Sequence, residues 1–389
     1  MNRLPRQARL FGVVSLFNDL ASEMVYPLLP AFLTGVLGAG PAALGALDGA
    51  ADLAAAGVKL GAGRLADRPR ARGPLVVAGY ALAVLVRPLI AFTGAVWQVI
   101  GLRVTDRIGK GVRTPPRDAI IADATPPELR GRAFGFQRGL DHVGAVIGPL
   151  VAWWLLTRAA FDVPGVITAS LVPGVVVLML AMWAVRDGRR RSESALPAPR
   201  VPTPTDPYRP SLPILMIAAF HLLRFPEALL ILRAQDLGVS VAGVTLLWAG
   251  LHVVRSAASF AGGELTDRWG AAATMRLGWV AYAGLAGAFA LARDATAAWT
   301  AFLALGVVAG LTEGPERTLV SGLARGRTGS GFGVYHGLTG VAALVGAIAL
   351  GAIYGRAGGS MALALSAGGV LALIAVSGVL SKGVPGVVR

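Results

Sequence analysis

The chain contains one acidic motif twice, about two hundred residues apart. The first copy is Gly63-Arg64-Leu65-Ala66-Asp67-Arg68, and the second is Gly263-Glu264-Leu265-Thr266-Asp267-Arg268. Each copy closes a long apolar stretch and is followed by another apolar stretch. A repeat of this length in so apolar a chain indicates two homologous halves embedded in a membrane, an organisation typical of transporters.

Composition indicates an integral membrane protein. Of the 389 residues, 55% are hydrophobic and 15% are charged, and the mean hydropathy is +0.65. A soluble domain carries about 25% charged residues. The chain contains no cysteine, which excludes disulfides and thiolate metal sites.

A helix that spans a bilayer needs about 20 largely apolar residues. Twelve segments meet this requirement, at residues 11–36, 42–64, 74–93, 96–121, 133–156, 164–184, 212–232, 240–264, 275–292, 297–322, 330–354 and 360–381. We therefore predict an all-α membrane protein with two pseudo-symmetric six-helix bundles around a central cavity. The predicted bundles are residues 1–185 and 212–389, joined by the Arg- and Pro-rich linker 186–211.

The arginines predict the orientation of the chain through the positive-inside rule. If the N-terminus is cytoplasmic, the outside loops hold only Arg158, Arg233, Arg293 and Arg356, and the inside segments hold many more. We expect a multi-pass protein of the inner (cytoplasmic) cell membrane with both termini in the cytoplasm. This placement explains most of the net charge of +15, so no nucleic-acid partner is expected.

The repeat extends beyond the opening motif. Residues 110–119 align with residues 309–318, and residues 134–140 align with residues 332–338. The fourth predicted helix therefore corresponds to the tenth, and the fifth corresponds to the eleventh. The two halves run in the same direction.

Charged side chains are costly inside a bilayer and usually face a cavity or a partner. Here they fall in two of every three predicted helices, whereas the third, sixth, ninth and twelfth carry almost none, with Arg87 as the exception. This pattern favours a polar central cavity. The candidates for contact with a solute are Arg103, Arg107, Asp141, His142, His221, Arg224, His252, Arg255 and Glu313.

Asp19 and Glu23 lie one helical turn apart in the first predicted helix and therefore share a face. Asp19 is about ten residues from the inner boundary, which places it near the midplane. Desolvation there penalises a charged carboxylate, so such a group can take up and release protons. Asp19, Glu23 and Asp52 are the candidates for proton coupling. A permanent ion pair of Asp19 with Arg107 or Arg103 is the alternative.

Several motifs occur in order at the helices where one family carries them. Residues 63–68 are followed by Arg70 and Arg72, the fourth helix contains Arg107-Ile108-Gly109-Lys110-Gly111, and the fifth contains Gly144-Ala145-Val146-Ile147-Gly148-Pro149. Over its full length the chain resembles the major facilitator superfamily. The fifth-helix motif resembles that of the drug or metabolite:proton antiporters, the efflux branch. The resemblance implies alternating access, with the two halves rocking about a midplane site.

A further set of residues is expected to act in gating or helix packing. Acidic and basic side chains near the repeated motif would anchor loops to helix ends, with a solvated loop charge as the alternative. The small residues of the fifth helix would permit close packing. These residues are Asp67, Arg68, Asp123, Asp267, Arg268, Gly144, Gly148 and Pro149.

The order of charges predicts an ion-pair lock between the halves. Arg117-Asp118 in the fourth helix corresponds to Glu316-Arg317 in the tenth, with the charges reversed. Pseudo-two-fold symmetry would bring Arg117 toward Glu316 and Asp118 toward Arg317. The alternative is that each pair is satisfied within its own half.

These features predict a secondary active transporter, a proton-coupled exporter of a small anionic or zwitterionic organic solute or drug. Proton-coupled import of an organic anion, export of a divalent metal and a transport-inactive membrane sensor are the alternatives. The sequence shows no nucleophile–base constellation, which argues against an enzyme. We expect no cofactor, no resident metal, and a monomer.

Overall fold

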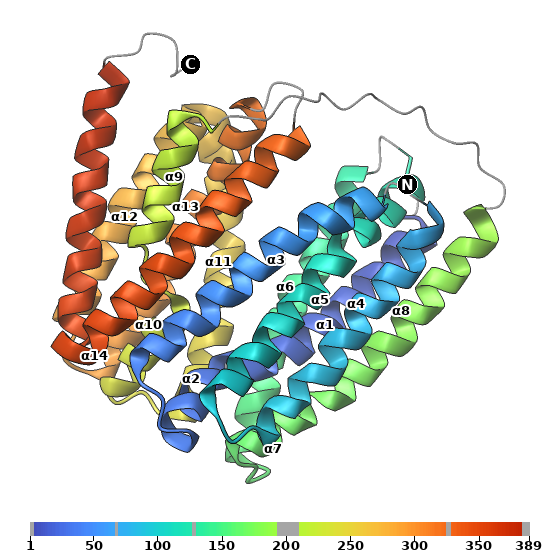
Figure 1. The fold of residues 1–389 in the computed structure, drawn as a ribbon, viewed down its shortest axis with the longest axis horizontal. Coiled ribbons are helices and arrows are strands. Elements are labelled where there is room, and N and C mark those ends of the chain that lie inside the picture. The colour runs from blue at the N-terminus through green and yellow to red at the C-terminus, as the bar shows by residue number, and fades with distance from the viewer. Residues whose placement is uncertain (1–3, 67–68, 127–129, 193–209, 324–327, 383–389) are drawn as a thin grey trace. The chain divides into compact units, whose positions relative to one another are not determined.

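The structure is a computed structural model that describes residues 4–66, 69–126, 130–192, 210–323 and 328–382. Within these ranges the regular elements are all helices (Figure 1). The helices include α1 (Arg6–Val25), α3 (Pro41–Ala66), α4 (Pro69–Leu89), α5 (Val96–Asp123), α6 (Arg130–Thr157), α7 (Val163–Ala169), α8 (Leu171–Ser192), α9 (Leu212–Leu223), α10 (Glu227–Asp236), α11 (Val241–Trp269), α12 (Ala271–Leu291), α13 (Ala295–Leu323) and α14 (Thr328–Lys382).

Several helices end at prolines, which lack a backbone N–H donor, or at a glycine, which adopts backbone angles that other residues avoid. α1 ends at Val25, and Pro27 and Pro30 follow in a short 3₁₀ helix (Tyr26–Leu28) and a short α-helical turn (Leu29–Ala31). Pro226 separates α9 from α10. Gly358 has φ 82° and divides α14 into two helices, since this left-handed conformation is easily adopted only by glycine.

Length and hydropathy identify membrane-spanning segments among the described residues. Seven segments are long and apolar enough to cross a bilayer, and the last of them, Gly333–Ser377, has 45 residues and contains the break at Gly358. The prediction of an all-α integral membrane protein is therefore confirmed. The count of twelve spans is consistent with these helices and stays a prediction.

The chain divides into two compact units. The first comprises Met1–Phe32 and Ala54–Pro202, and the second comprises Leu33–Leu53 and Thr203–Arg389. The first half of α3 thus packs with the second unit, although it precedes the linker in sequence. The division at residues 1–185, 186–211 and 212–389 follows the sequence repeat and stays a prediction. Within the predicted linker, α8 continues to Ser192, and residues 193–209 lie outside the described part.

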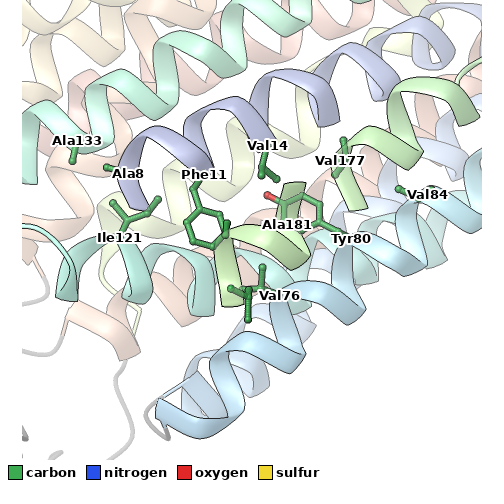
Figure 2. Packing of buried hydrophobic residues seen from close by; sticks show 12 residues of the cluster. Ala8, Phe11, Val14, Val76, Tyr80, Val84, Ile121, Ala133, Val177 and Ala181 are labelled. Atoms are coloured by element: carbon green, nitrogen blue, oxygen red, sulfur yellow. The ribbon is translucent and has the colours of Figure 1, made fainter. Parts of the chain in front are cut away.

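The first unit packs α1 against α6 and α8, and α4 against α5 and α8. Figure 2 shows the apolar cluster that joins these helices, with Phe11, Val14 and Tyr80 completely buried. The second unit repeats the arrangement, because α9 packs against α14 and α12 packs against α13.

Glycines set the closest helix contact in each unit. A Cβ built on Gly144 of α6 would lie 2.2 Å from the Leu16 carbonyl oxygen of α1, and one on Gly148 would lie 2.5 Å from the Leu20 oxygen. In the second unit, a Cβ on Gly346 would lie 1.9 Å from the Leu222 oxygen. These backbones approach so closely that no larger residue fits.

Gly144→Ala is therefore expected to destabilise the protein by about 1–3 kcal/mol, because the added methyl group overpacks the α1–α6 contact. Gly139→Ala is the matched control on the same helix, where an added Cβ would meet nothing within 4 Å. Thermal unfolding in detergent should show a lower melting temperature for the Gly144 variant alone. Equal melting temperatures for both variants would contradict this packing.

Candidate functional site

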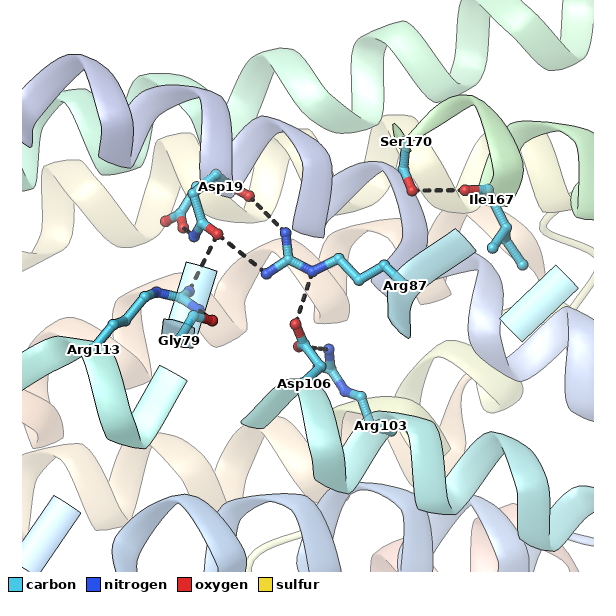
Figure 3. A network of polar contacts seen from close by, with 9 residues as sticks. Asp19, Gly79, Arg87, Arg103, Asp106, Arg113, Ile167 and Ser170 are labelled. Atoms are coloured by element: carbon cyan, nitrogen blue, oxygen red, sulfur yellow. Dashed lines mark hydrogen bonds and ion pairs between the residues drawn. The ribbon is translucent and has the colours of Figure 1, made fainter. Parts of the chain in front are cut away.

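A buried ion pair joins α4 and α5 in the first unit. Arg87 Nε of α4 donates to Asp106 Oδ1 of α5 at 2.8 Å, and Arg103 Nη1 donates to Asp106 Oδ2 at 3.3 Å. All three side chains are at most 5% exposed. Figure 3 shows Asp106 between the two guanidinium groups. One carboxylate thus satisfies donors from two arginines that would be very costly to bury alone.

Asn18 of α1 connects this ion pair to Asp19. Its side-chain Oδ1 accepts hydrogen bonds from Arg87 Nη2 and from Arg113 Nη2, both at 3.2 Å. Its Nδ2 donates to Asp19 Oδ1 at 2.9 Å. Because two cationic donors fix the amide oxygen, the amide nitrogen must face the Asp19 carboxylate. Asp19 is therefore held in place by a chain of contacts that begins at the Arg87–Asp106 pair.

Aromatic rings cover two of these arginines. The Arg103 guanidinium lies 4.7 Å from the centre of the Tyr26 ring, and the Arg113 guanidinium lies 4.6 Å from that of Tyr80. Cation–π contacts of this kind stabilise a desolvated cation. They help to fix the charges within the membrane-spanning part of the unit.

A second polar cluster in the same unit joins α1, α5 and α6. Ser15 Oγ accepts from Gln137 Nε2 at 2.8 Å and from Arg117 Nη1 at 3.4 Å. Gln137 Nε2 also donates to Asp141 Oδ2 at 2.8 Å, and Asp141 lies close enough to Asp19 to interact electrostatically. Asp19 and Asp141 thus face one shared polar region of the first unit.

In the second unit, the break between α9 and α10 positions two arginines on one carboxylate. Arg224 follows the last residue of α9, and its Nη2 lies 3.5 Å from Glu227 Oε1. Arg255 Nη2 of α11 pairs with the same oxygen. Buried His252 lies one turn away on α11, with its ring edge-on to Trp248 at 5.4 Å.

A further cluster in the second unit joins α9, α13 and α14. His221 Nε2 lies 3.1 Å from Glu316 Oε2, and the Tyr335 hydroxyl donates to that same oxygen at 2.8 Å. The sequence pattern placed Glu316 in a lock with Arg117. In this structure Arg117 pairs with Asp118 at 2.8 Å, and Glu316 contacts His221 and Tyr335. The lock stays a prediction.

The repeat shows that only one half carries the buried ion pair. Residues 110–119 align with 309–318, so Leu305 occupies the place of Asp106 and Thr312 that of Arg113. Gly79 lies against Arg113, and Gly278 lies against Thr312 in the same way, so Gly79 corresponds to Gly278. Counting along each helix from these glycines, Ala286 is the counterpart of Arg87. Leu305, Thr312 and Ala286 are all buried. The second half therefore fills this position with neutral side chains.

The α1–α6 and α9–α14 contacts extend the comparison to the first helix of each half. Because Gly148 and Gly346 are aligned and contact Leu20 and Leu222 respectively, Asn18 corresponds to Phe220, and Asp19 corresponds to His221. Phe220 stacks on Trp279, with ring centres 5.3 Å apart, where the first half has its hydrogen-bonded network.

The predicted gating residues near the repeated motif are only partly described. Asp123 pairs with Arg72, whose Nε donates to the Ala66 carbonyl oxygen at 2.6 Å. Arg268 pairs with Glu264 at 2.5 Å on an exposed surface. Asp67 and Arg68 lie outside the described residues, as does the side chain of Asp267.

The remaining predicted site residues are not brought into one cluster by the contacts above. Asp52 is exposed, whereas Glu23, Arg107, His142 and Glu313 are half-buried. Arg317 is exposed and Pro149 is buried. Among the described residues, no group of three His, Asp or Glu side chains is arranged to hold a metal ion.

Sequence reasoning missed the roles of Asn18, Arg113, Tyr335 and the Arg87–Asp106 pair. One signal was available, because Arg87 is the exceptional charge of an otherwise apolar helix and such a charge requires a partner. Asn18 and Tyr335 carry no charge, so neither hydropathy nor charge pattern distinguishes them.

The ion pair generates a stability prediction. Asp106→Leu should cost about 3–5 kcal/mol, because it leaves buried guanidinium groups without a carboxylate. Arg87→Met should cost less, since Arg103 still pairs with Asp106. The double variant should melt at a higher temperature than Asp106→Leu alone. Strictly additive losses in thermal unfolding would show that the two side chains are not coupled.

Comparison with known proteins identifies the family. Residues 11–347 match the family model of the Major Facilitator Superfamily. An uncharacterized protein of Mycobacterium tuberculosis is 31% identical over 378 residues, covering 95% of this chain and 91% of that protein. The multidrug resistance protein MdtH of Photorhabdus laumondii is 32% identical over 158 residues, which is 39% of each chain.

Solved structures share the fold at low sequence identity. The crystal structure of a POT family transporter in complex with 5-aminolevulinic acid superposes with a TM-score of 0.77 at 10% identity, covering 97% of this chain and 96% of the other. The family model extends over most of the sequence, and the fold agrees with it. The chain is therefore a multi-pass membrane protein that belongs to the major facilitator superfamily of transporters.

Proposed function

We propose that this transporter is a proton-coupled exporter of a small anionic or zwitterionic organic solute, acting by alternating access. Membership of the family supports transport of a small molecule. The similarity to the multidrug resistance protein MdtH over 158 residues supports the direction of transport. We further propose that the protein works as a monomer in the inner cell membrane.

The proposal that the solute is anionic is supported by the arrangement of arginines in the second unit. Arg224 and Arg255 share a single oxygen of Glu227, and all three side chains are between 16% and 21% exposed. Two guanidinium groups on one carboxylate favour a further negative group nearby. The partial exposure of these side chains leaves them within reach of a solute.

Asp19 carries the proposal of proton coupling. It is half-buried on α1, it accepts a hydrogen bond from Asn18, and it acts electrostatically on the carboxylate of Asp141. Two neighbouring carboxylates in a desolvated region do not both remain ionised at low cost, so they share a proton readily. A proton that binds here changes the charge of the first unit during the transport cycle. Glu23 and Asp52 remain the next candidates.

Asp19→Asn should abolish gradient-driven transport and leave solute exchange largely intact, because asparagine keeps the size of the side chain but carries no proton. The solute for this test would be found by screening organic anions and zwitterions for those that raise the melting temperature of the purified protein. Accumulation under an imposed proton gradient and exchange without a gradient would then be measured in liposomes.

Asp294→Asn is the matched control. Asp294 Oδ1 accepts from the Ala297 N–H at the start of α13, and asparagine caps a helix equally well. This control should transport normally. Normal accumulation by the Asp19 variant would contradict the assignment of proton coupling to Asp19.

The proposed orientation has its own test, which the lack of native cysteine makes clean. Ser192→Cys should react only with a thiol reagent admitted to the cytoplasm, and Ala295→Cys should react only from outside. Labelling of intact cells and inverted vesicles checks both sites. The reverse pattern of labelling would contradict cytoplasmic termini and the depth assigned to Asp19.

A further inference from the structure

The contacts of Glu316 distinguish it from the other acidic residues of the second unit. Its side chain is only 4% exposed, and one oxygen, Oε2, is contacted by both His221 Nε2 and the Tyr335 hydroxyl. His221 is 22% exposed. The three side chains come from three different helices, so the fold rather than local sequence assembles them.

Other charged and aromatic groups lie on the helices around the contact between His221 and Glu316. On α13 itself, Glu313 is half-buried and Arg317 is exposed. On α14, the ring of His336 lies against Tyr335 with centres 4.8 Å apart. Arg255 of α11 pairs with Glu227, and Tyr282 of α12 bonds with Ser366. The rings of Phe220 and His221 on α9 lie in a T-shaped arrangement with centres 6.0 Å apart.

A histidine and a buried carboxylate at this distance form a site for one proton. The reference state is a neutral imidazole next to an ionised carboxylate. When this pair binds one proton, it becomes neutral overall, either as imidazolium–carboxylate or as imidazole–carboxylic acid. Without that proton the pair has a net negative charge in a desolvated place. The Tyr335 hydroxyl donates to the carboxylate in the charged form and so makes release of the proton feasible.

The more exposed member of the pair provides the route for the proton. The His221 side chain is partly exposed, whereas that of Glu316 is buried. In the deprotonated pair the carboxylate only accepts hydrogen bonds, so Nε2 carries a hydrogen and donates it to Glu316. A proton from water therefore adds to the other ring nitrogen, Nδ1, and leaves from it, and no other bond of the protein forms or breaks. His221 is also the repeat counterpart of Asp19, and Glu316 is that of Arg117.

We propose that His221, Glu316 and Tyr335 form a second proton-binding site, independent of Asp19. Each half of the transporter then has one proton-binding group at the same position of its first helix. The contribution of this site to coupling rests on the function proposed above. The binding of the proton itself does not, and it can be measured without a solute.

Histidine labelled with ¹⁵N tests the site directly, because the chain has only four histidines. The ring signal that disappears in His221→Gln identifies His221 in the reconstituted protein. We expect this signal to change with pH, and Glu316→Gln to move the midpoint of the change by about one pH unit or more. Tyr335→Phe should move the midpoint in the same experiment by a smaller amount.

Tyr354→Phe is the matched control, since it removes another tyrosine hydroxyl that donates to a carboxylate of the same unit, that of Asp236. This variant and Asp19→Asn should leave the midpoint of His221 unchanged. If Glu316→Gln does not fold, Tyr335→Phe still decides the matter, because it keeps the shape of the side chain.

Two results would overturn the site: a His221 signal that does not titrate, or a midpoint that neither Glu316→Gln nor Tyr335→Phe moves. If Asp19→Asn moves the midpoint of the His221 signal, the site is not independent of Asp19. Proton-driven transport with any of these results would leave the proposed function standing. The expected titration without proton-driven transport would support the site and contradict the proposed function.

Discussion

The free-energy cost of a charge inside an apolar protein in a bilayer governs the structure of this transporter. Arg87 and Asp106 are almost completely buried, and their pairing at 2.8 Å offsets the free energy lost when both charges leave water. Arg103 and Arg113 join the pair through Asp106 and Asn18. Removal of Asp106 leaves the buried guanidinium groups of Arg87 and Arg103 without their shared carboxylate, so the positions of α4 and α5 depend on each other.

The two halves solve the same packing problem differently. The first uses a network of charges and an amide. The second stacks Phe220 on Trp279 and has the buried neutral residues Ala286 and Leu305 at the positions aligned with Arg87 and Asp106. The helix contacts at Gly148 and Gly346 are nevertheless equivalent. The repeat therefore preserves the backbone approach while the buried polar groups differ. This difference places a carboxylate at Asp19 and an imidazole at the equivalent His221.

The sequence was sufficient for the fold class and for the family, because a repeated motif and long apolar segments depend only on local composition. The pairing of charges was harder to predict. An ion pair of Asp19 with Arg107 or Arg103 was the alternative to proton coupling, and neither possibility pointed to Asp106, which pairs with Arg103 and Arg87 in the structure. Which arginine a carboxylate meets depends on helix rotation and depth, which hydropathy does not determine.

Other features depend on contacts between distant segments. Asp48 of α3 accepts a hydrogen bond from the Ala228 N–H at the start of α10, at 3.2 Å, and Gly45 of α3 lies against Ala347 of α14. These contacts explain why residues 33–53 pack with the second unit. A repeat alignment compares each residue with its counterpart and contains no information on such pairings.

The most direct test of proton-coupled transport is a count of protons that move with the solute. Purified wild-type protein would be reconstituted in liposomes that contain a pH indicator, and an anionic or zwitterionic solute identified by thermal shift would be added outside. Proton-coupled transport predicts a change of internal pH that requires the solute and whose initial rate follows that of solute movement. Solute movement with no change of internal pH would contradict it.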